Sequence, residues 1–319
     1  MKSKKYQTSR LTTGTPPRLK GSSINFSKCI VQKGDEIPIP FSFLTKSIDT
    51  KQYPCFITHT NENTHKIILD NFQNSPLFDG SIISKGPRYC PSIEDKVKRF
   101  EGKDKHQIFL EPETRSGELI YPNGISTSLD KNAQQHFLRT INGLEHVIVE
   151  ELGYAVEYDC VDSNELELTY ESKRIKGLYL AGQINGTTGY EEAAAQGLLA
   201  GINAARSLAK LNEIVIDRSQ GYLGVLTSDL NKGGLVEPYR MFTSRAEYRL
   251  LLRADNADER LTDLAIQIGT AEKERKMVWV NKKKMLKNAV EKLISLKAAP
   301  QKYANAGLKT VSYTHLRAH

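Results

Sequence analysis

The sequence has few of the residues that build disulfide-linked, metal-bound or membrane-spanning folds. Its 319 residues include only four cysteines, and none forms a C-x-x-C pair, which argues against zinc ribbons and disulfide frameworks. No apolar run approaches the roughly 18 residues of a membrane span. A G-x-G-x-x-G turn, the usual dinucleotide-binding fingerprint, is also absent. We therefore expect an intracellular protein without a membrane span or a bound metal.

Hydrophobic content and charge narrow the classes of protein that remain. Hydrophobic residues make up 39% of the chain, which is enough for the cores of about two domains. The net charge of +8 permits a polyanionic partner such as a nucleic acid. Much of the positive excess lies in a Lys-rich tail, residues 272–319, to which the sequence assigns no role. Charge alone therefore does not identify the partner.

The most informative stretch combines an apolar run, a glycine-rich loop and a helical pattern. Gly177–Ala181 predicts a short, buried parallel strand. Gly182–Gly189 holds three glycines and two threonines, so backbone N–H groups can approach a ligand closely. Tyr190–Ala205 predicts a helix with Glu191 and Glu192 in its first turn. This order is typical of sites for phosphate or an anionic ring edge, although a loop whose glycines serve only packing has the same spacing.

The predicted helix also has a candidate buried face. Small and aliphatic side chains recur along one stripe, which we expect to face a sheet. Two glycines four residues apart, Gly197 and Gly201, would allow the helix to lie close to that sheet. The stripe consists of Ala194, Leu198, Ile202 and Ala205.

Further motifs occur in the order found in one protein family. They are Thr13–Leu19, Cys55–Asn61, Gly86–Lys96, Gln107–Glu113, Tyr121–Thr127 and Glu237–Arg249. Together with the glycine-rich stretch they resemble the MnmG/GidA family, flavoproteins that modify the wobble uridine of tRNA. The resemblance covers about residues 10–262 and is far more specific than a single glycine fingerprint. The family's first flavin motif has no counterpart here, so we expect a fragment of a longer enzyme.

The resemblance implies a fold class and a domain order. We expect an α/β chain: a partial two-dinucleotide-binding flavoprotein fold of the glutathione-reductase type, with an inserted α+β domain and the start of a helical C-terminal domain. A flavin-domain segment is followed by the NAD-contacting insertion, the rest of the FAD-binding domain, a helical region and the unassigned tail. The respective boundaries are 1–20, 21–159, 160–211, 212–271 and 272–319. Within the insertion, alternation predicts strands at Gln107–Leu110, Val147–Val149 and Tyr154–Tyr158.

The resemblance also assigns cofactor-binding positions. Gln183 ends the predicted strand, where an amide can both donate to and accept from ribityl hydroxyls; a loop-capping glutamine is the alternative. The positions matching the FAD motif are Gly182, Gln183, Gly186, Thr187, Thr188 and Gly189. The positions in the stretch that the family uses for NAD are Gly86, Pro87, Arg88, Tyr89, Pro91, Ser92 and Lys96.

Cys90 is the candidate catalytic residue. It follows Arg88 and precedes a helix that we expect Ser92 to cap, and both a guanidinium and a helix N-terminus stabilise a thiolate. Thiolate addition to C6 of uracil would make C5 nucleophilic toward a one-carbon electrophile. A single cysteine is more often a small buried side chain, but the resemblance matches Cys90 to the family's catalytic cysteine. The cysteines expected to be structural are Cys29, Cys55 and Cys160.

Three arginines form the candidate tRNA-binding face. Arg245, Arg249 and Arg253 are spaced four apart on a helix that Ser244-x-x-Glu247 would begin as a capping box. Such a face can follow a phosphate backbone. The alternative is a solvated stripe whose arginines pair with nearby carboxylates.

The resemblance implies that the full protein adds an aminomethyl-type group, carboxymethylaminomethyl or taurinomethyl, at C5 of the wobble uridine of tRNA. The implied cofactors are FAD, NADH and 5,10-methylenetetrahydrofolate as the one-carbon donor. The implied partners are tRNA, a GTP-hydrolysing MnmE-type protein and a second copy in a homodimer. The compartment would be mitochondrial in a eukaryote, the favoured case, or cytoplasmic in a bacterium. Alternatives are an NAD(P)H-dependent flavin reductase, a folate- and FAD-dependent tRNA uridine methyltransferase, and a non-catalytic RNA-binding fragment.

Overall fold

The structure, a computed structural model, describes residues 6–84, 86, 88, 91–296 and 305–307. It contains two compact units. The first comprises the described residues up to 252, apart from 42–44. The second comprises residues 42–44 and the described residues from 253 onward.

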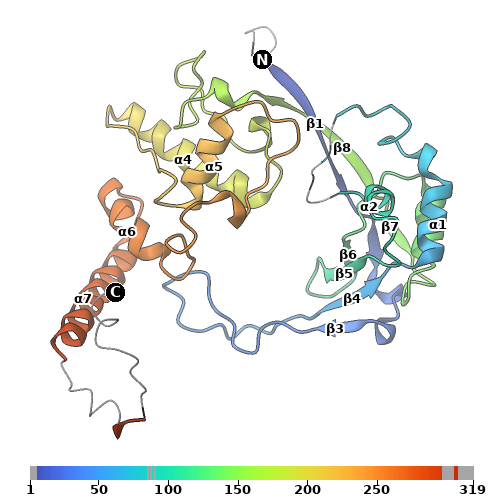
Figure 1. The fold of residues 1–319 in the computed structure, drawn as a ribbon, viewed down its shortest axis with the longest axis horizontal. Helices are drawn as coiled ribbons and strands as arrows, with labels where there is room; N and C mark the ends of the chain where they lie inside the picture. The colour runs from blue at the N-terminus through green and yellow to red at the C-terminus, as the bar shows by residue number, and fades with distance from the viewer. Residues whose placement is uncertain (1–5, 85, 87, 89–90, 297–304, 308–319) are drawn as a thin grey trace. The chain divides into compact units, whose positions relative to one another are not determined.

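A long two-stranded ribbon organises the first unit. Strand β1 (Thr8–Thr15) pairs antiparallel with β8 (Tyr154–Val161) over its whole length, from Thr8 opposite Val161 to Thr15 opposite Tyr154. All the strands of the other sheet lie between these two strands in the sequence. Figure 1 shows the ribbon leading into that sheet region. The fold is thus a mixed α/β arrangement with an α+β region inserted between β1 and β8, as the sequence predicted.

The inserted region contains an antiparallel sheet of six strands. Each neighbouring pair is antiparallel, so hairpins and helical connections build it without parallel crossovers. The predicted strand at Gln107–Leu110 is present, whereas the one predicted at Val147–Val149 begins only at Val149. In spatial order the strands are β3 (Ile30–Gln32), β4 (Cys55–His59), β5 (Gln107–Pro112), β6 (Leu119–Asn123), β2 (Arg18–Lys20) and β7 (Val149–Glu151).

Three helices complete the core of this region: α1 (Glu62–Asp70), α2 (Ile93–Arg99) and α3 (Lys131–Leu138). Asn61 and Thr64 form a reciprocal capping box at the start of α1. The side chains of the sheet and helices share one apolar cluster, in which Phe137 and Leu110 are fully buried. The core therefore lies between the sheet and the helices.

The predicted strand at Gly177–Ala181 does not form a parallel strand. Tyr179 instead makes an isolated antiparallel bridge with Glu171. Leu180 N donates to Tyr170 O at 3.1 Å, and Ser172 N donates to Leu178 O at 2.7 Å. The preceding turn thus supplies the hydrogen-bond partners of this run, and no parallel strand neighbours it among the described residues.

The helix predicted after the glycine loop is present as α4 (Tyr190–Leu208), but its predicted buried face is wrong. Leu198 is 59% exposed, and a Cβ added at Gly197 or Gly201 would meet no neighbouring atom within 4 Å. The face is set by polar side chains that bond to adjacent loops, which an apolar pattern does not reveal. Its buried residues are Glu192, Gln196, Leu199, Ala200 and Asn203.

Helix α5 (Tyr222–Asn231) packs with α4 in a second apolar cluster of the first unit. Short 3-10 turns connect the longer elements. They are η2 (Gly21–Ser23), η3 (Phe26–Lys28), η4 (Phe72–Asn74), η5 (Ser163–Glu165), η6 (Gly182–Asn185) and η7 (Thr243–Arg245).

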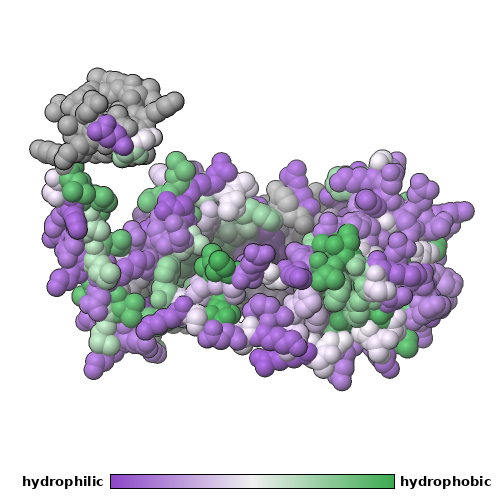
Figure 2. Space-filling model, turned by 90° about the horizontal axis from the view of Figure 1, so that it is seen from below, coloured by the Kyte–Doolittle hydropathy of each residue, from purple (hydrophilic) through white to green (hydrophobic). Residues whose placement is uncertain are grey.

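The second unit is built on two helices, α6 (Ala257–Ile268) and α7 (Lys273–Ser295). Trp279, the only tryptophan in the sequence, is buried and donates from Nε1 to Asp263 Oδ1 at 2.8 Å. Among the described residues no helix combines the length and apolarity needed to cross a membrane. In Figure 2 hydrophilic residues cover most of the visible face, with hydrophobic groups between them.

Replacing Phe137 with Ala should destabilise the first unit by about 3 to 5 kcal/mol, because the change removes a fully buried ring and leaves a cavity in the sheet–helix core. Urea unfolding followed by circular dichroism measures the loss. Phe41→Ala is the matched control: its ring is fully exposed, so a change within about 0.5 kcal/mol is expected. Equal losses in the two variants would contradict the assigned core.

Candidate functional site

The glycine-rich loop turns sharply before α4 begins. Gly182 and Gly186 have φ of 87° and 81°, a region that other residues rarely adopt. Gly182 starts the 3-10 turn η6, and Gly186 ends it. Gly189 then lies at the N-cap position of α4. The loop therefore leads the chain directly to a helix N-terminus, where unpaired backbone N–H groups favour negative charge.

Buried amides hold this loop in place. Gln196 of α4 accepts hydrogen bonds through Oε1 from Gly182 N at 3.1 Å and from Asn185 Nδ2 at 2.8 Å. Its Nε2 donates to Thr187 Oγ1 at 3.1 Å. Asn185, Thr187 and Gln196 are all fully buried. The side chain of Gln196 from the following helix thus fixes the loop.

Two buried oxygens at the loop have no hydrogen-bond partner among the described residues: Asn185 Oδ1 and Glu192 Oε2. Unsatisfied buried polar atoms are uncommon and mark places where a bound group or water completes the bonding. A Cβ on Gly189 would come within 1.9 Å of Glu192 Oε2, so the backbone passes directly over that carboxylate. Both orphan atoms are acceptors, and the ribityl hydroxyls of FAD are donors that can satisfy such atoms, so in this respect the residues fit FAD.

The predicted FAD-binding residues differ in accessibility. Gln183 is exposed, whereas Gly182, Gly186 and Thr187 are buried; Thr188 and Gly189 are half-buried. Gln183 and the N-terminal edge of α4 are thus the accessible part of the set. The hydroxyl of the buried Thr187 already bonds to Gln196, so Thr187 shapes the loop from inside.

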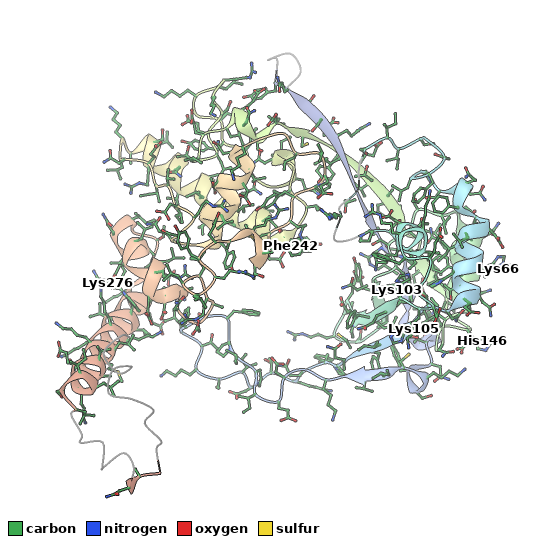
Figure 3. The ribbon with its side chains drawn as sticks, viewed as in Figure 1. Lys66, Lys103, Lys105, His146, Phe242 and Lys276 are labelled. Atoms are coloured by element: carbon green, nitrogen blue, oxygen red, sulfur yellow. The ribbon has the colours of Figure 1, made fainter. Side chains whose placement is uncertain are left out.

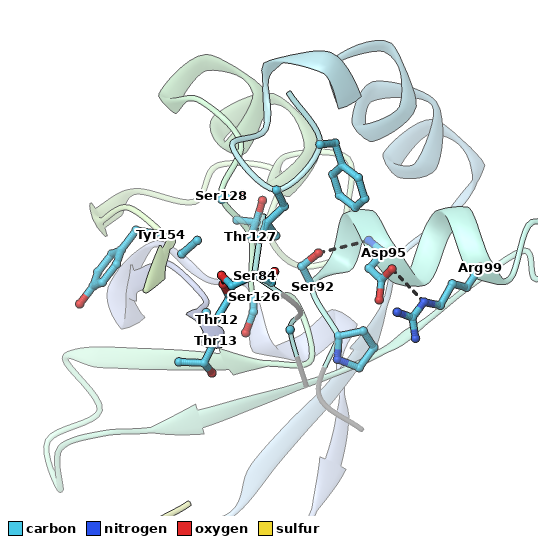
Figure 4. Close-up of a pocket in the computed structure, with 16 residues that line it drawn as sticks. Thr12, Thr13, Ser84, Ser92, Asp95, Arg99, Ser126, Thr127, Ser128 and Tyr154 are labelled. Atoms are coloured by element: carbon cyan, nitrogen blue, oxygen red, sulfur yellow. Dashed lines mark hydrogen bonds and ion pairs between the residues drawn. The ribbon is translucent and has the colours of Figure 1, made fainter. Parts of the chain in front are cut away.

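A second candidate site is a hydroxyl-lined cavity of about 130 Å³ beside the start of α2. Figure 4 shows side chains from the ribbon, the 126–128 loop and α2 around it. Ser92 Oγ accepts from Asp95 N at 3.2 Å, which confirms the predicted cap, and Asp95 pairs with Arg99. The other hydroxyl-bearing lining residues are Thr12, Thr13, Ser84, Ser126, Thr127, Ser128 and Tyr154.

The structure brings together part of the predicted NAD set. Gly86, Pro91 and Ser92 line the cavity. Lys96 does not line it, because its Nζ donates to Gly124 O at 2.7 Å. Arg88 is exposed. Pro87, Tyr89 and the candidate catalytic Cys90 lie outside the described residues.

Glu94, which the sequence did not single out, joins three segments around the cavity. Its fully buried Oε1 accepts from Thr127 Oγ1 at 3.0 Å, from Ser128 N at 2.9 Å and from Ser75 Oγ at 3.4 Å. Burial is the largest influence on this carboxyl and raises its pKa above the ordinary value. Glu94 thus ties α2 to the 126–128 loop of the cavity wall.

The predicted arginine helix is wrong. Residues 246–253 form turns and irregular backbone, with only the 3-10 turn η7 at Thr243–Arg245. Arg245 Nε donates to Arg240 O at 2.9 Å, and its guanidinium lies 4.4 Å from the centroid of the Tyr239 ring. Arg253 belongs to the second unit and pairs with Asp255 at 2.9 Å. Arg245 and Arg253 thus bond to partners within the chain instead of forming a helical face. Arg249 and Arg253 are exposed, whereas Arg245 is half-buried.

Basic side chains also occur on the inserted region, where the sequence analysis did not place them. Figure 3 shows Lys66, Lys103, Lys105 and His146 in the region of α1 and the sheet. Lys103 Nζ lies 5.1 Å from the centroid of the Phe100 ring. They come from three separate stretches of the sequence, at residues 66, 103–105 and 146, so only the fold reveals that they share a region.

Comparisons with known proteins agree with these features. The model of a family described as glucose inhibited division protein A matches residues 1–212. The chain is 50% identical, over 97% of its length and 49% of the relative's, to the tRNA uridine 5-carboxymethylaminomethyl modification enzyme MnmG of Clostridium botulinum. It is 54% identical, over 94% of its length and 48% of the relative's, to the enzyme of that name from Thermodesulfovibrio yellowstonii.

Solved structures give the same result. Aquifex aeolicus GidA in its form II crystal matches with a TM-score of 0.84 at 42% identity, covering 94% of this chain and 49% of that chain. The form I crystal matches with a TM-score of 0.86 at 44% identity, covering 93% and 51%. The chain spans about half the length of the curated relatives it matches. Because a match over 97% of the chain leaves few residues outside, most of the Lys-rich region 272–319 also resembles these relatives.

Glu94 should make the stability of the chain depend on pH. Its folded-state pKa lies above the unfolded value, so its contribution is fully present below the unfolded pKa and is lost as pH rises through the folded pKa. The free energy of unfolding of Glu94→Gln, compared with that of the unaltered chain, should therefore rise between pH 4 and pH 8. Urea unfolding at the two pH values measures both free energies. Glu62→Gln, which removes an exposed carboxylate, is the control. A relative loss for Glu94→Gln with rising pH would contradict the assignment.

Proposed function

This chain belongs to the glucose inhibited division protein A family, also called GidA or MnmG, and from that premise we propose that it forms part of an FAD-dependent enzyme that modifies the wobble uridine of tRNA. The observation that carries the proposal is the identity of 50% over nearly the whole chain to a protein named as a tRNA uridine 5-carboxymethylaminomethyl modification enzyme. The glycine loop before α4 supports it independently, because its residues fit a flavin nucleotide.

FAD, when bound, supplies the redox chemistry. The chain's own contribution begins with the loop Gly182–Gly189 and the N-terminus of α4, which would orient the cofactor. The exposed amide of Gln183 would bond to the ribityl hydroxyls. The buried Gln196 fixes the loop through its hydrogen bonds to Gly182 and Thr187.

Cys90 is the proposed nucleophile. A thiolate would add to C6 of the uracil ring, and the electrons of the C5–C6 double bond would move onto the C4 carbonyl oxygen. C5 of the resulting enolate would then attack a one-carbon electrophile, and loss of the C5 proton with release of the thiolate from C6 would restore the C5–C6 double bond. The hydroxyl-lined cavity adjoins Pro91 and Ser92, which follow Cys90 directly in the sequence, and can accept a polar, uncharged ring or amide.

NADH as the hydride source, with the cavity at Gly86, Pro91 and Ser92 as its contact, belongs to the same proposal. So do 5,10-methylenetetrahydrofolate as the one-carbon donor, a GTP-hydrolysing partner of the MnmE type, and homodimer formation. The relatives compared above are bacterial, which favours a carboxymethylaminomethyl product. The mitochondrial or cytoplasmic location stays a prediction.

A folate- and FAD-dependent tRNA uridine methyltransferase is the second candidate function. It would use the same kind of flavin loop and also act at C5 of a uridine. Nucleoside analysis of tRNA separates the two functions, because one product is 5-methyluridine and the other carries an aminomethyl group.

Cys90→Ser should abolish modification while FAD content stays near that of the unaltered enzyme, because a hydroxyl is a far weaker nucleophile than a thiolate at neutral pH. The experiment uses a protein of the relatives' full length that contains this chain, and chromatography of nucleosides from tRNA gives the readout. Cys29→Ser is the control, since Cys29 packs against the core of the inserted region. Full modification by the Cys90→Ser protein would remove this cysteine from the mechanism.

Arg245 and Arg249 should respond in opposite ways to replacement by Gln. Arg245 bonds to Arg240 O and stacks on Tyr239, so Arg245→Gln should lower the melting temperature. The exposed Arg249 is free to approach tRNA, so Arg249→Gln should reduce the salt dependence of tRNA binding by roughly one unit and leave melting unchanged. An unchanged salt slope in Arg249→Gln would exclude it as a phosphate contact.

A further inference from the structure

Arg240 lies on a segment that is fastened to the glycine loop. Its neighbour Tyr239 forms a parallel β-bridge with Thr187. Tyr239 N donates to Gly186 O at 2.9 Å, and Thr188 N donates to Tyr239 O at 3.1 Å. Two backbone hydrogen bonds thus fix the segment against the loop. The first residues of the motif Glu237–Arg249, which carries part of the family resemblance, therefore support the glycine loop.

Glu192 of α4 fixes the guanidinium of Arg240. Its Oε1 accepts from Met241 N at 2.7 Å and from Arg240 Nε at 3.2 Å. A Cβ on Gly189 would lie 1.9 Å from Glu192 Oε2 and 3.0 Å from Arg240 Nε. Only a glycine therefore allows the ion pair to sit against the N-terminal edge of α4.

Of the two groups in this ion pair, the guanidinium of Arg240 is the one exposed to solvent. The carboxylate of Glu192 is 2% exposed, whereas the side chain of Arg240 is 34% exposed. Arg240 bonds to the carboxylate through Nε, and no hydrogen bond engages its terminal nitrogens within the described part of the chain. Up to four N–H groups of the guanidinium can still donate. They add to the positive end of the α4 dipole at the same place.

A guanidinium next to a helix N-terminus selects a ligand with a delocalised negative charge on acceptor atoms. Resting on the proposed flavin function, we infer that Arg240 is a flavin-contacting residue that donates to the N1–C2=O edge of the flavin, which becomes negatively charged on reduction, and that Glu192 is the positioning residue holding it there. Neither residue lies within the loop Gly182–Gly189 itself. The diphosphate of FAD offers similar chemistry, but its charge does not change with the redox state.

The test measures FAD affinity in both redox states in a protein of the relatives' full length that contains this chain. Arg240→Gln should weaken binding of reduced FAD at least tenfold more than binding of oxidised FAD. A tenfold difference lowers the two-electron midpoint potential by about 30 mV. Arg240→Lys, which keeps the charge, should restore part of the difference. Arg139→Gln, an exposed arginine in the inserted region, is the control and should change neither affinity.

The role of Glu192 is tested by a double-mutant cycle. If Glu192 acts by holding Arg240, then Arg240→Gln should change the ratio of the two affinities less in a Glu192→Gln background than in the unaltered protein. Additive effects would overturn the positioning role. Circular dichroism of every variant confirms that the fold is intact, and Arg240→Lys serves as the test should Arg240→Gln not fold.

The remaining outcomes are separable. Equal weakening of both redox states would assign Arg240 to the diphosphate or to the loop alone and overturn the N1–C2=O contact. Unchanged affinities for both states in Arg240→Gln would overturn any contact with the flavin. Failure of the unaltered full-length protein to bind FAD would reject the proposed function, and this inference with it.

Discussion

The register of the β1–β8 ribbon is the constraint on which both candidate sites depend. Thr12 of β1 bonds to Ser84, and Ser84 Oγ donates to Glu157 Oε1 of β8 at 2.8 Å. The segment that leads to the cavity is thereby anchored on the ribbon. At the next residue of β8, Tyr158 OH donates to Thr187 O of the glycine loop at 3.1 Å. Two adjacent strands therefore hold one end of the cavity and one side of the loop.

The second feature that organises the first unit is a cluster of charges around Asp229 of α5. Its carboxylate accepts from Tyr239 OH at 2.9 Å and from Arg218 Nη1 at 2.6 Å. Arg218 also bonds to Glu247 at 2.8 Å. Arg245, which the sequence suggested as a tRNA contact, also lies 4.0 Å from Asp229 and so helps to fasten the chain segment that supports the glycine loop. Charge within a motif does not reveal whether its partner is another molecule or the same chain.

Much of the fold and of the glycine loop could be predicted from the sequence, because the information there is local. Glycines at Gly182 and Gly186 indicate the left-handed turns, and Tyr190 onward has a clear helical pattern. The α+β insertion was predicted from several motifs that occur in the order found in one family, and no single residue indicated it. The cap of α2 at Ser92 likewise needs only a residue type and a spacing.

The errors concern partners that are distant in the sequence. The run Gly177–Ala181 has the composition of a parallel strand, but its hydrogen bonds are made by an antiparallel turn. The buried face of α4 was missed because Gln196 is buried through hydrogen bonds and not through apolarity. Glu94 and Arg240 were missed for the same reason: only the folded chain shows what a carboxylate or guanidinium bonds to.

The length of the ribbon has a consequence for how this chain can vary. Side chains alternate between the two faces of a strand, so removing one residue from β1 would turn Thr12 away from Ser84 and move every later residue to the opposite face. An insertion or deletion of one residue in the ribbon would therefore misplace both candidate sites, whereas a change of length in a surface loop costs little. We therefore expect the lengths of loops to vary among related proteins, whereas the number of residues in β1 and β8 stays constant.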